Sequence, residues 1–257
     1  MNHPTSRLRS AHDVGENWTA ADATELYEIA RWGKGYFAIG DNGQVKVHPT
    51  KDPNRSIDLK QLVDDLQARG ISLPTLIRFR DILQHRLKDI SEAFQGAIAQ
   101  HEYGGQYICV YPIKVNQQRQ VVEEVLDFGR PYHFGLEAGS KPELLAVAAL
   151  ADNDTPIICN GFKDAEFIEM AMLAQKIGRN IIPVVEKYTE LDLILEYAEK
   201  VGVRPKIGMR VKLAARGGGR WQSSGGYRSK FGLTVGEILR GLEELKTRGM
   251  EDCFQVL

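Results

Sequence analysis

The chain has 257 residues, a formal net charge of −1 and a hydrophobic content of 43%, which is typical of a globular protein with one large or two smaller domains. A net charge so close to zero argues against nucleic acid or an anionic membrane surface as the main partner. No apolar stretch has the length of a membrane span, and the opening segment MNHPTSRLRSAHDVGENWTA lacks the apolar core of a signal peptide.

The cysteines and histidines give no sign of disulfides or of a metal centre. Cys109, Cys159 and Cys253 are widely spaced and lie in apolar surroundings, a pattern that favours reduced thiols in a cytoplasmic protein. The six histidines are scattered and show no metal-ligand spacing, so the sequence alone predicts no metal site.

Residues 1–55 are predicted to form a segment of their own, part of a second, β-rich domain. Thr19 is predicted to cap a helix that extends through Trp32. Residues 36–39 and 44–48, joined by an Asn-Gly turn, predict a β-hairpin. A lone hairpin is only marginally stable in water, so we expect this one to join a sheet completed by other strands.

Residues 56–257 are predicted to form the main domain. It opens with helices at residues 57–69 and 81–99. Apolar runs then begin at 107, 132, 156, 181 and 206, about 25 residues apart, with helical patterns between them. Strands that alternate with helices at this spacing predict a parallel sheet of βα units.

The helices of this series are predicted from a capping residue at the start, a glycine after the last turn, or both. The predicted N-caps are Ser140 with Glu143 as a capping box, Asp164, Thr189, and Thr234 with Glu237; the predicted terminating glycines are Gly129, Gly178, Gly202 and Gly249.

The near-constant period and the continuous apolar strands favour a (β/α)8 TIM-type barrel over an open sheet. About five βα units are present, followed by the start of a sixth strand at residues 253–257. An unpaired apolar strand leaves an edge open to aggregation. We therefore expect the sequence to be the N-terminal part of a longer protein with an incomplete barrel.

Lys114 is the leading candidate for chemistry. It closes the apolar run at 107–113, and active sites of barrels lie at the C-terminal ends of the strands. Burial there would disfavour the ammonium form and make the amine nucleophilic, as in lysines that form Schiff bases with carbonyl cofactors. The alternative is a lysine that has left the sheet and lies in water.

Other polar residues follow the later strands. Glu137 ends the second run, while Asn160 and Glu186 follow the third and fourth and could be ordinary loop residues. Arg210 alternates with apolar residues in the fifth run, so it is predicted to point into the barrel, where it needs an anionic partner. The alternative to a binding role is a structural ion pair between Arg210 and Glu137. Glu143 is also explained by capping alone.

The basic, glycine-rich loop at residues 214–227 could cradle a phosphate or contact RNA. The alternative is a mobile lid over the mouth of the barrel. Because the net charge is near zero and no second basic aromatic patch exists, we predict no nucleic-acid partner.

Five ordered motifs carry a family resemblance: YPIKVNQ, GLEAGSKPELLA, ICNGFKDAEF, IGMRVKLA and WQSSGGYRSKFGL. They resemble the biosynthetic arginine decarboxylases, which are alanine-racemase-like (fold type III) enzymes dependent on pyridoxal 5′-phosphate (PLP). The resemblance covers residues 18–257 and makes 56–257 the first part of the PLP-binding barrel. The early segment LYEIARWGKGYFAIGDNGQVKVHP is similar to arginine decarboxylases and not to the shorter ornithine or diaminopimelate decarboxylases.

The resemblance also implies roles for individual residues. Lys114 matches the lysine that holds PLP as a Schiff base, and Arg210 matches an arginine beside the cofactor ring. Glu137 and Glu143 match acidic positions near the cofactor, and Lys230 matches a lysine directed toward a partner subunit of a homo-oligomer. Magnesium is implied by the family, although no ligand set is evident. The family's ring-stacking histidine, phosphate loop, pyridine-nitrogen partner and partner-subunit cysteine match no position in this sequence.

The activity that the resemblance implies for the intact protein is decarboxylation of L-arginine to agmatine and CO2 in polyamine (putrescine and spermidine) biosynthesis. Residues 1–257 alone are expected to be inactive. One alternative is a sister decarboxylase acting on ornithine, lysine or diaminopimelate, against which the early segment argues. The other is a truncated PLP-binding or regulatory homologue without catalysis.

Overall fold

The computed structural model describes residues 18–213 and 229–257 of the chain. The chain divides into two compact units, Met1–Arg86 and Leu87–Leu257, whereas the domain boundary predicted at 55/56 stays a prediction. The glycine-rich loop at 214–227 lies outside the described residues. Among the residues described, no helix combines the length and apolar character needed to cross a lipid bilayer.

The first unit is built around a small antiparallel sheet. Its elements are α1 (Ala20–Leu26), α2 (Ile29–Gly33), β1 (Phe37–Ile39), β2 (Val45–Val47), β3 (Ile57–Asp58) and α3 (Leu59–Ala68). The predicted hairpin is confirmed: β1 and β2 pair antiparallel, with Ile39 opposite Val45. A third strand, β3, pairs with β2, so the residues predicted to open a helix at 57 instead extend the sheet.

The N-terminal helix begins as predicted and ends early. Thr19 forms a capping box with Asp22, whose carboxylate accepts from the Thr19 backbone amide at 2.9 Å. The helix does not run unbroken to Trp32, because Glu28 has a φ of 49° and separates α1 from α2. The Trp32 indole donates to the Tyr27 carbonyl at 2.9 Å, which satisfies an acceptor exposed by the break.

The second unit is a parallel sheet with helices on its outer side. Its strands are β4 (Val110–Pro112), β5 (Gly135–Ala138), β6 (Ile157–Cys159), β7 (Ile181–Val185), β8 (Ile207–Met209) and β9 (Phe254–Val256), hydrogen-bonded in that order. Short 3-10 turns are η1 (Ile113–Val115), η2 (Arg130–Tyr132) and η4 (Glu251–Cys253). The predicted series of parallel strands, including the sixth, is confirmed.

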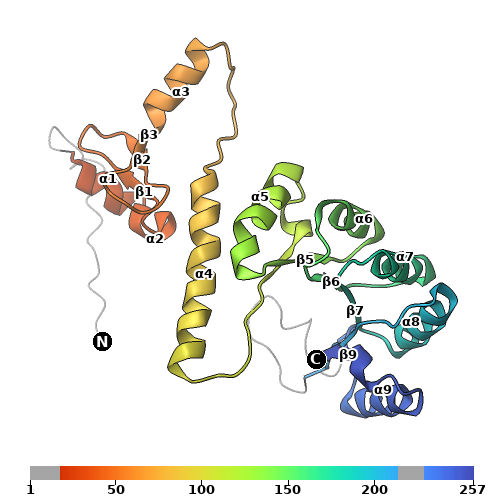
Figure 1. The fold of residues 1–257 in the computed structure, drawn as a ribbon. Coiled ribbons are helices and arrows are strands. Elements are labelled where there is room, and N and C mark those ends of the chain that lie inside the picture. The colour runs from red at the N-terminus through yellow and green to blue at the C-terminus, as the bar shows by residue number, and fades with distance from the viewer. Residues whose placement is uncertain (1–17, 214–228) are drawn as a thin grey trace. The chain divides into compact units, whose positions relative to one another are not determined.

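The helices alternate with these strands, as predicted. They are α5 (Arg119–Gly129), α6 (Lys141–Leu150), α7 (Ala165–Lys176), α8 (Tyr188–Val201) and α9 (Val235–Thr247); a further helix, α4 (Arg80–Gln100), crosses the boundary between the units. Figure 1 shows α5 to α9 following one another along the outer side of the strands. The hydrogen-bond order therefore brings the C-terminal ends of successive strands to one edge.

The core lies between strands and helices. Ile157, Ile181 and Ile207 from the strands and Ile168 and Ile194 from the helices are fully buried. Burying each such side chain contributes about 1.5–3 kcal/mol relative to leaving it exposed. The strands therefore read as continuous apolar runs because their residues are covered from the helix side and by neighbouring strands.

Of the four N-caps predicted for this series, Asp164 and Thr234 are confirmed, Ser140 is confirmed in position but not as a capping box, and Thr189 is wrong. Asp164 accepts from the Phe167 amide at 2.9 Å, and Thr234 forms its capping box with Glu237. Ser140 is the N-cap residue of α6, but its side chain makes no capping bond, and the Glu143 carboxylate accepts from the amide of Gly139 in place of that of Ser140. Helix α8 begins at Tyr188, before Thr189, because the Glu190 carboxylate binds backbone amides ahead of the helix.

Candidate active site

A pocket of about 540 Å³ lies at the C-terminal ends of the parallel strands. Its lining residues come from the ends of β4 to β9 and from the segments that follow them: Lys114, Glu137, Gly139, Glu143, Ile158, Asn160, Gly161, Val184, Glu186, Met209, Arg210, Phe231, Val256 and Leu257. Lys114, Glu137, Glu143 and Arg210, which the sequence singled out, therefore line one pocket. This edge of a parallel sheet is where α/β proteins bind their ligands.

Lys114 lies in the 3-10 turn η1, immediately after β4, and its side chain is exposed. The expectation of a buried lysine at this strand end is therefore wrong, because the chain leaves the sheet at Ile113, the buried residue of the turn. Lys114 nevertheless lines the pocket. Its amine is accessible to a ligand that enters from solvent.

Arg210 is held by a carboxylate other than the one considered from sequence. Its NH1 atom lies 2.6 Å from Oε1 of Glu186, which follows β7. The Glu186 side chain is 1% exposed and the Arg210 side chain 41% exposed, so a buried anion anchors a half-exposed guanidinium. The alternative of an ion pair between Arg210 and Glu137 is therefore wrong, because the partner of Arg210 is Glu186. The guanidinium also lies 5.8 Å from the centre of the Phe231 ring.

Glu137 and Glu143 lie in different environments within the same pocket. Glu137 is 5% exposed, and its Oε2 atom has no hydrogen-bond partner among the described residues. A buried carboxylate oxygen without a donor is costly, and such an oxygen at a pocket wall can accept a hydrogen bond from a ligand. Glu143 is already engaged, since its Oε2 atom accepts from the Gly139 amide at 2.7 Å.

The turns after β5 and β6 touch backbone to backbone. Gly161 has a φ of 77°, and a Cβ atom added there would lie 2.7 Å from the Gly139 carbonyl oxygen. Only glycine satisfies both the positive φ and this close approach. The contact brings Asn160 and Gly161 to the pocket wall beside Gly139.

Sequence inspection missed a fully buried ion pair behind the pocket. Lys163 and Glu190 have side chains that are 0% and 2% exposed, and their Nζ and Oε2 atoms lie 3.1 Å apart. The only local signal was a lysine in the motif ICNGFKDAEF, where the neighbouring Asp164 was correctly assigned as a cap. Lys163 reads as an ordinary loop lysine because its partner is distant in the sequence.

Lys230 is exposed and is not among the residues that line the pocket. Its neighbour Ser229 is buried, and the Ser229 hydroxyl donates to the Phe231 carbonyl at 2.8 Å. The turn that carries Lys230 is thus fixed at a residue on each side. A role for Lys230 at a subunit interface stays a prediction.

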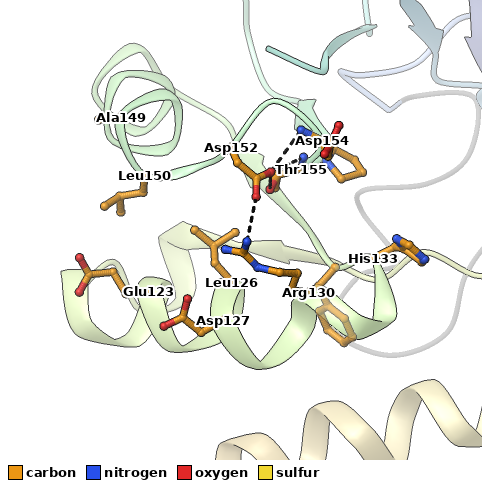
Figure 2. Close-up of a pocket in the computed structure, with 12 residues that line it drawn as sticks. Glu123, Leu126, Asp127, Arg130, His133, Ala149, Leu150, Asp152, Asp154 and Thr155 are labelled. Carbon is orange, nitrogen blue, oxygen red and sulfur yellow. Dashed lines mark hydrogen bonds and ion pairs between the residues drawn. The ribbon is translucent and has the colours of Figure 1, made fainter. Parts of the chain in front are cut away.

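A second hollow, of about 620 Å³, lies at the opposite ends of the strands, between the ends of α5 and α6. Figure 2 shows Arg130 approaching Asp152 there, with an N–O distance of 3.8 Å. The Asp152 carboxylate accepts the hydroxyl and the amide of Thr155, and these bonds hold its pKa below the usual range. The carboxylate is therefore used to fix its own turn, and this hollow is not the candidate site.

The three cysteines carry free thiols, as predicted. Cys159 and Cys253 are buried and Cys109 is half-buried. Burial raises the pKa of the Cys159 thiol to about 12, although the nearby Lys163 opposes the shift. Cys159, at the end of β6 near the pocket, is therefore a packing residue and not a nucleophile.

We expect iodoacetamide at pH 8 to alkylate Cys109 first and Cys159 more than about a hundredfold more slowly, because the thiolate is the reactive form. A raised pKa lowers the thiolate fraction at this pH, and burial restricts access as well. Mass spectrometry of peptides from the native protein, sampled over time, measures both rates. Equal rates in the folded protein, with unfolded protein as the reference, would contradict the burial of Cys159.

Comparison with known proteins places the fold. The family described as pyridoxal-dependent decarboxylase, pyridoxal binding domain, matches residues 87–251. The chain resembles the crystal structure of the biosynthetic arginine decarboxylase from Campylobacter jejuni, with 33% identity, a TM-score of 0.77, and coverage of 90% of this chain and 37% of that one. The diaminopimelate decarboxylase from M. jannaschi, at 21% identity, TM-score 0.63 and coverage of 88% and 47%, shares the fold. The predicted barrel class of the PLP-dependent fold type III decarboxylases is confirmed.

Curated relatives have the same name as the first of these structures. The biosynthetic arginine decarboxylase of Rhodopirellula baltica is 58% identical over 95% of this chain and 36% of its own length. That of Gloeobacter violaceus is 51% identical over 94% of this chain and 38% of its own length. This chain thus spans little more than a third of these relatives. On the match to residues 87–251, it belongs to the pyridoxal-dependent decarboxylase family, and the second unit contains its pyridoxal-binding domain.

Proposed function

We propose that the pocket at Lys114 binds PLP and that the full-length protein decarboxylates L-arginine to agmatine and CO2. The observation that carries this proposal is the meeting of Lys114 and Arg210 in one pocket at the C-terminal strand ends, in a chain of a pyridoxal-dependent decarboxylase family. The choice of arginine rests on relatives that are 58% and 51% identical to this chain and bear that name.

The residues present fit the cofactor. Lys114 offers an accessible amine for an aldehyde, and Arg210 offers a cation that the buried Glu186 holds at the pocket wall. The unpaired Oε2 atom of Glu137 offers a buried acceptor on the same wall. When bound, PLP supplies an electron sink for the electron pair that remains after the carboxylate of an amino acid leaves as CO2.

The chain's own residues then have distinct tasks. Lys114 would bind the cofactor aldehyde through Nζ and, once the amino group of the substrate replaces it, would hold a proton at that atom. Arg210 would hold the cofactor ring in place from the pocket wall. Glu137 would accept a hydrogen bond from a donor group of the cofactor or the substrate. Ile158, Val184 and Met209 form apolar wall that excludes water, which strengthens the charge interactions inside.

A direct assay tests this activity. Full-length protein loaded with PLP is expected to release CO2 from carboxyl-labelled L-arginine. It should act on ornithine, lysine and diaminopimelate at most about a hundredth as fast, because a site that pairs the polar groups of its substrate rejects analogues that lack them. Residues 1–257 alone are expected to release none, because the six described strands follow one another without closing a ring. Equal release from another amino acid would replace arginine as the substrate.

Further parts of the proposal rest on the family resemblance. A homo-oligomer with Lys230 at the subunit interface, a cytoplasmic location and a requirement for magnesium belong to it. Among the residues described, no group of three or more histidine, cysteine, aspartate or glutamate side chains is arranged to hold a metal ion. A magnesium requirement would therefore be examined on the full-length protein, by decarboxylation before and after chelation.

A further inference from the structure

The buried pair of Lys163 and Glu190 lies at the centre of a network that joins the strand ends. Lys163 follows β6, and its ammonium donates to the Gly161 carbonyl at 2.5 Å and pairs with the Oε2 atom of Glu190 at 3.1 Å. A lysine is seldom fully buried, and it then requires partners for its charge. Here both partners are supplied, one by its own turn and the other by the first turn of α8.

Glu190 carries the link from the turn after β6 to the end of β7. Its Oε1 atom accepts from the Lys163 amide at 3.2 Å, and its Oε2 atom accepts from the Glu186 amide at 2.8 Å. One carboxylate thus fixes the backbone of two strand-end segments at once. Charge-assisted hydrogen bonds to backbone amides are among the stronger ones in proteins, and burial strengthens them further.

The network reaches the pocket through Glu186. The Glu186 carboxylate pairs with Arg210 at 2.6 Å, and the Glu186 carbonyl accepts from the Gly232 amide at 2.9 Å. At the other end, Gly161 packs against Gly139, so the connected contacts run from the end of β5 to the end of β8. Gly139, Gly161, Glu186 and Arg210 all line the pocket, whereas Lys163 and Glu190 lie behind it.

We propose that Lys163 and Glu190 are positioning residues of the PLP pocket: their buried ion pair locks the turns after β6 and β7 so that Glu186 presents Arg210 to the bound cofactor. The effect on cofactor binding rests on the proposed function. The effect of the ion pair on the positions of Glu186 and Arg210 does not. Neither residue touches the pocket, so each acts only through the backbone of Gly161 and Glu186 and through Arg210.

The test uses the full-length protein and a matched control. Lys163→Met removes the buried ammonium at nearly constant volume. Lys200→Met makes the same change in an exposed pair: Lys200 of α8 lies 3.5 Å from Glu169 of α7, whereas Lys163 lies in the turn just before α7. Two quantities are measured for each variant: hydrogen exchange of the backbone amides at residues 184–190 and 207–212 in the protein without PLP, and the dissociation constant for added PLP.

Lys163→Met is expected to speed amide exchange in both segments and to raise the PLP dissociation constant. Each change should be about tenfold or more, because that is the effect of losing one charge-assisted interaction. Lys200→Met is expected to leave both within about twofold of wild type, because exposed ion pairs contribute little. Combining Lys163→Met with Arg210→Met is expected to weaken PLP binding no further than Arg210→Met alone, because coupled residues are not additive.

Several results would overturn the inference. Wild-type exchange in Lys163→Met would refute the network, and faster exchange with unchanged PLP affinity would leave the pair a purely structural one. Full additivity with Arg210→Met would also refute action through Arg210. If Lys163→Met does not fold, Glu190→Gln carries the same test, since its amide keeps one acceptor for the backbone. A wild-type protein that binds no PLP would refute the proposed function, while the exchange comparison would still decide whether the pair holds Glu186 and Arg210.

Discussion

Replacement of Lys114 with alanine is expected to abolish covalent capture of PLP by the full-length protein. Borohydride reduction of the wild-type protein with PLP should leave a stable label on the peptide that contains Lys114, because its amine lines the pocket. The fold should survive, since Lys114 is exposed and substitutions of exposed side chains usually change stability by about 0.5 kcal/mol or less. Digestion and mass spectrometry of the labelled protein measure the outcome.

Lys200→Ala is the control for this result, because Lys200 is an exposed lysine of the same unit and does not line the pocket. It should retain the label in full. Free PLP reacts slowly with exposed lysines in general, so the measured quantity is the fraction of label on each peptide at one equivalent of PLP. A label that stays in Lys114→Ala, or that lies mainly on another lysine of the wild-type protein, would remove Lys114 from its proposed role.

Replacement of Arg210 with methionine should weaken PLP binding or slow turnover by about tenfold or more. Methionine keeps most of the side-chain volume and loses charge-assisted hydrogen bonds worth about 1.5–3 kcal/mol each. The same change leaves the Glu186 carboxylate, 1% exposed, without its cation, so stability should also fall. Loss of affinity and loss of stability must therefore be separated.

The double variant Arg210→Met with Glu186→Gln separates them. Glutamine removes the buried charge, so the melting temperature should recover relative to Arg210→Met alone. PLP affinity should stay low, because the guanidinium is still absent from the pocket. Calorimetry and a PLP titration measure the two quantities on the same samples. Wild-type PLP affinity and turnover in Arg210→Met would show that the arginine serves only its ion pair with Glu186.

Local signals in the sequence were sufficient for most of the secondary structure. Asp164 and Thr234 cap their helices because each side chain reaches an amide only three residues ahead. At Ser140 the start of the helix was predicted correctly and the capping box was not, since the Glu143 carboxylate accepts from the amide of Gly139. The backbone of Glu28, with its positive φ, broke a helix that the pattern of side chains extended.

The candidate site was predictable in its location and less so in its contacts. The alternation of the fifth apolar run placed Arg210, which directly follows β8, on the pocket side, but its partner Glu186 is 24 residues earlier in the chain. Lys163 and Glu190 are separated by 27 residues, and neither lies in a sequence pattern that indicates a buried charge. Pairings at this distance depend on how adjacent βα units stack, and a single sequence carries no direct signal of that geometry.

The order of the strands in the parallel sheet is the same as their order in the chain. During synthesis at about 5–20 residues per second, a βα unit of about 25 residues leaves the ribosome in roughly 1–5 s. Helices and local contacts form far faster than that. Each new strand therefore meets an edge that its predecessor has already made, and pairing never waits for a distant segment. The sheet is suited to vectorial assembly: the edge of each newly made strand is covered as soon as the next strand pairs with it, while the outer edge of β4 stays open among the described strands.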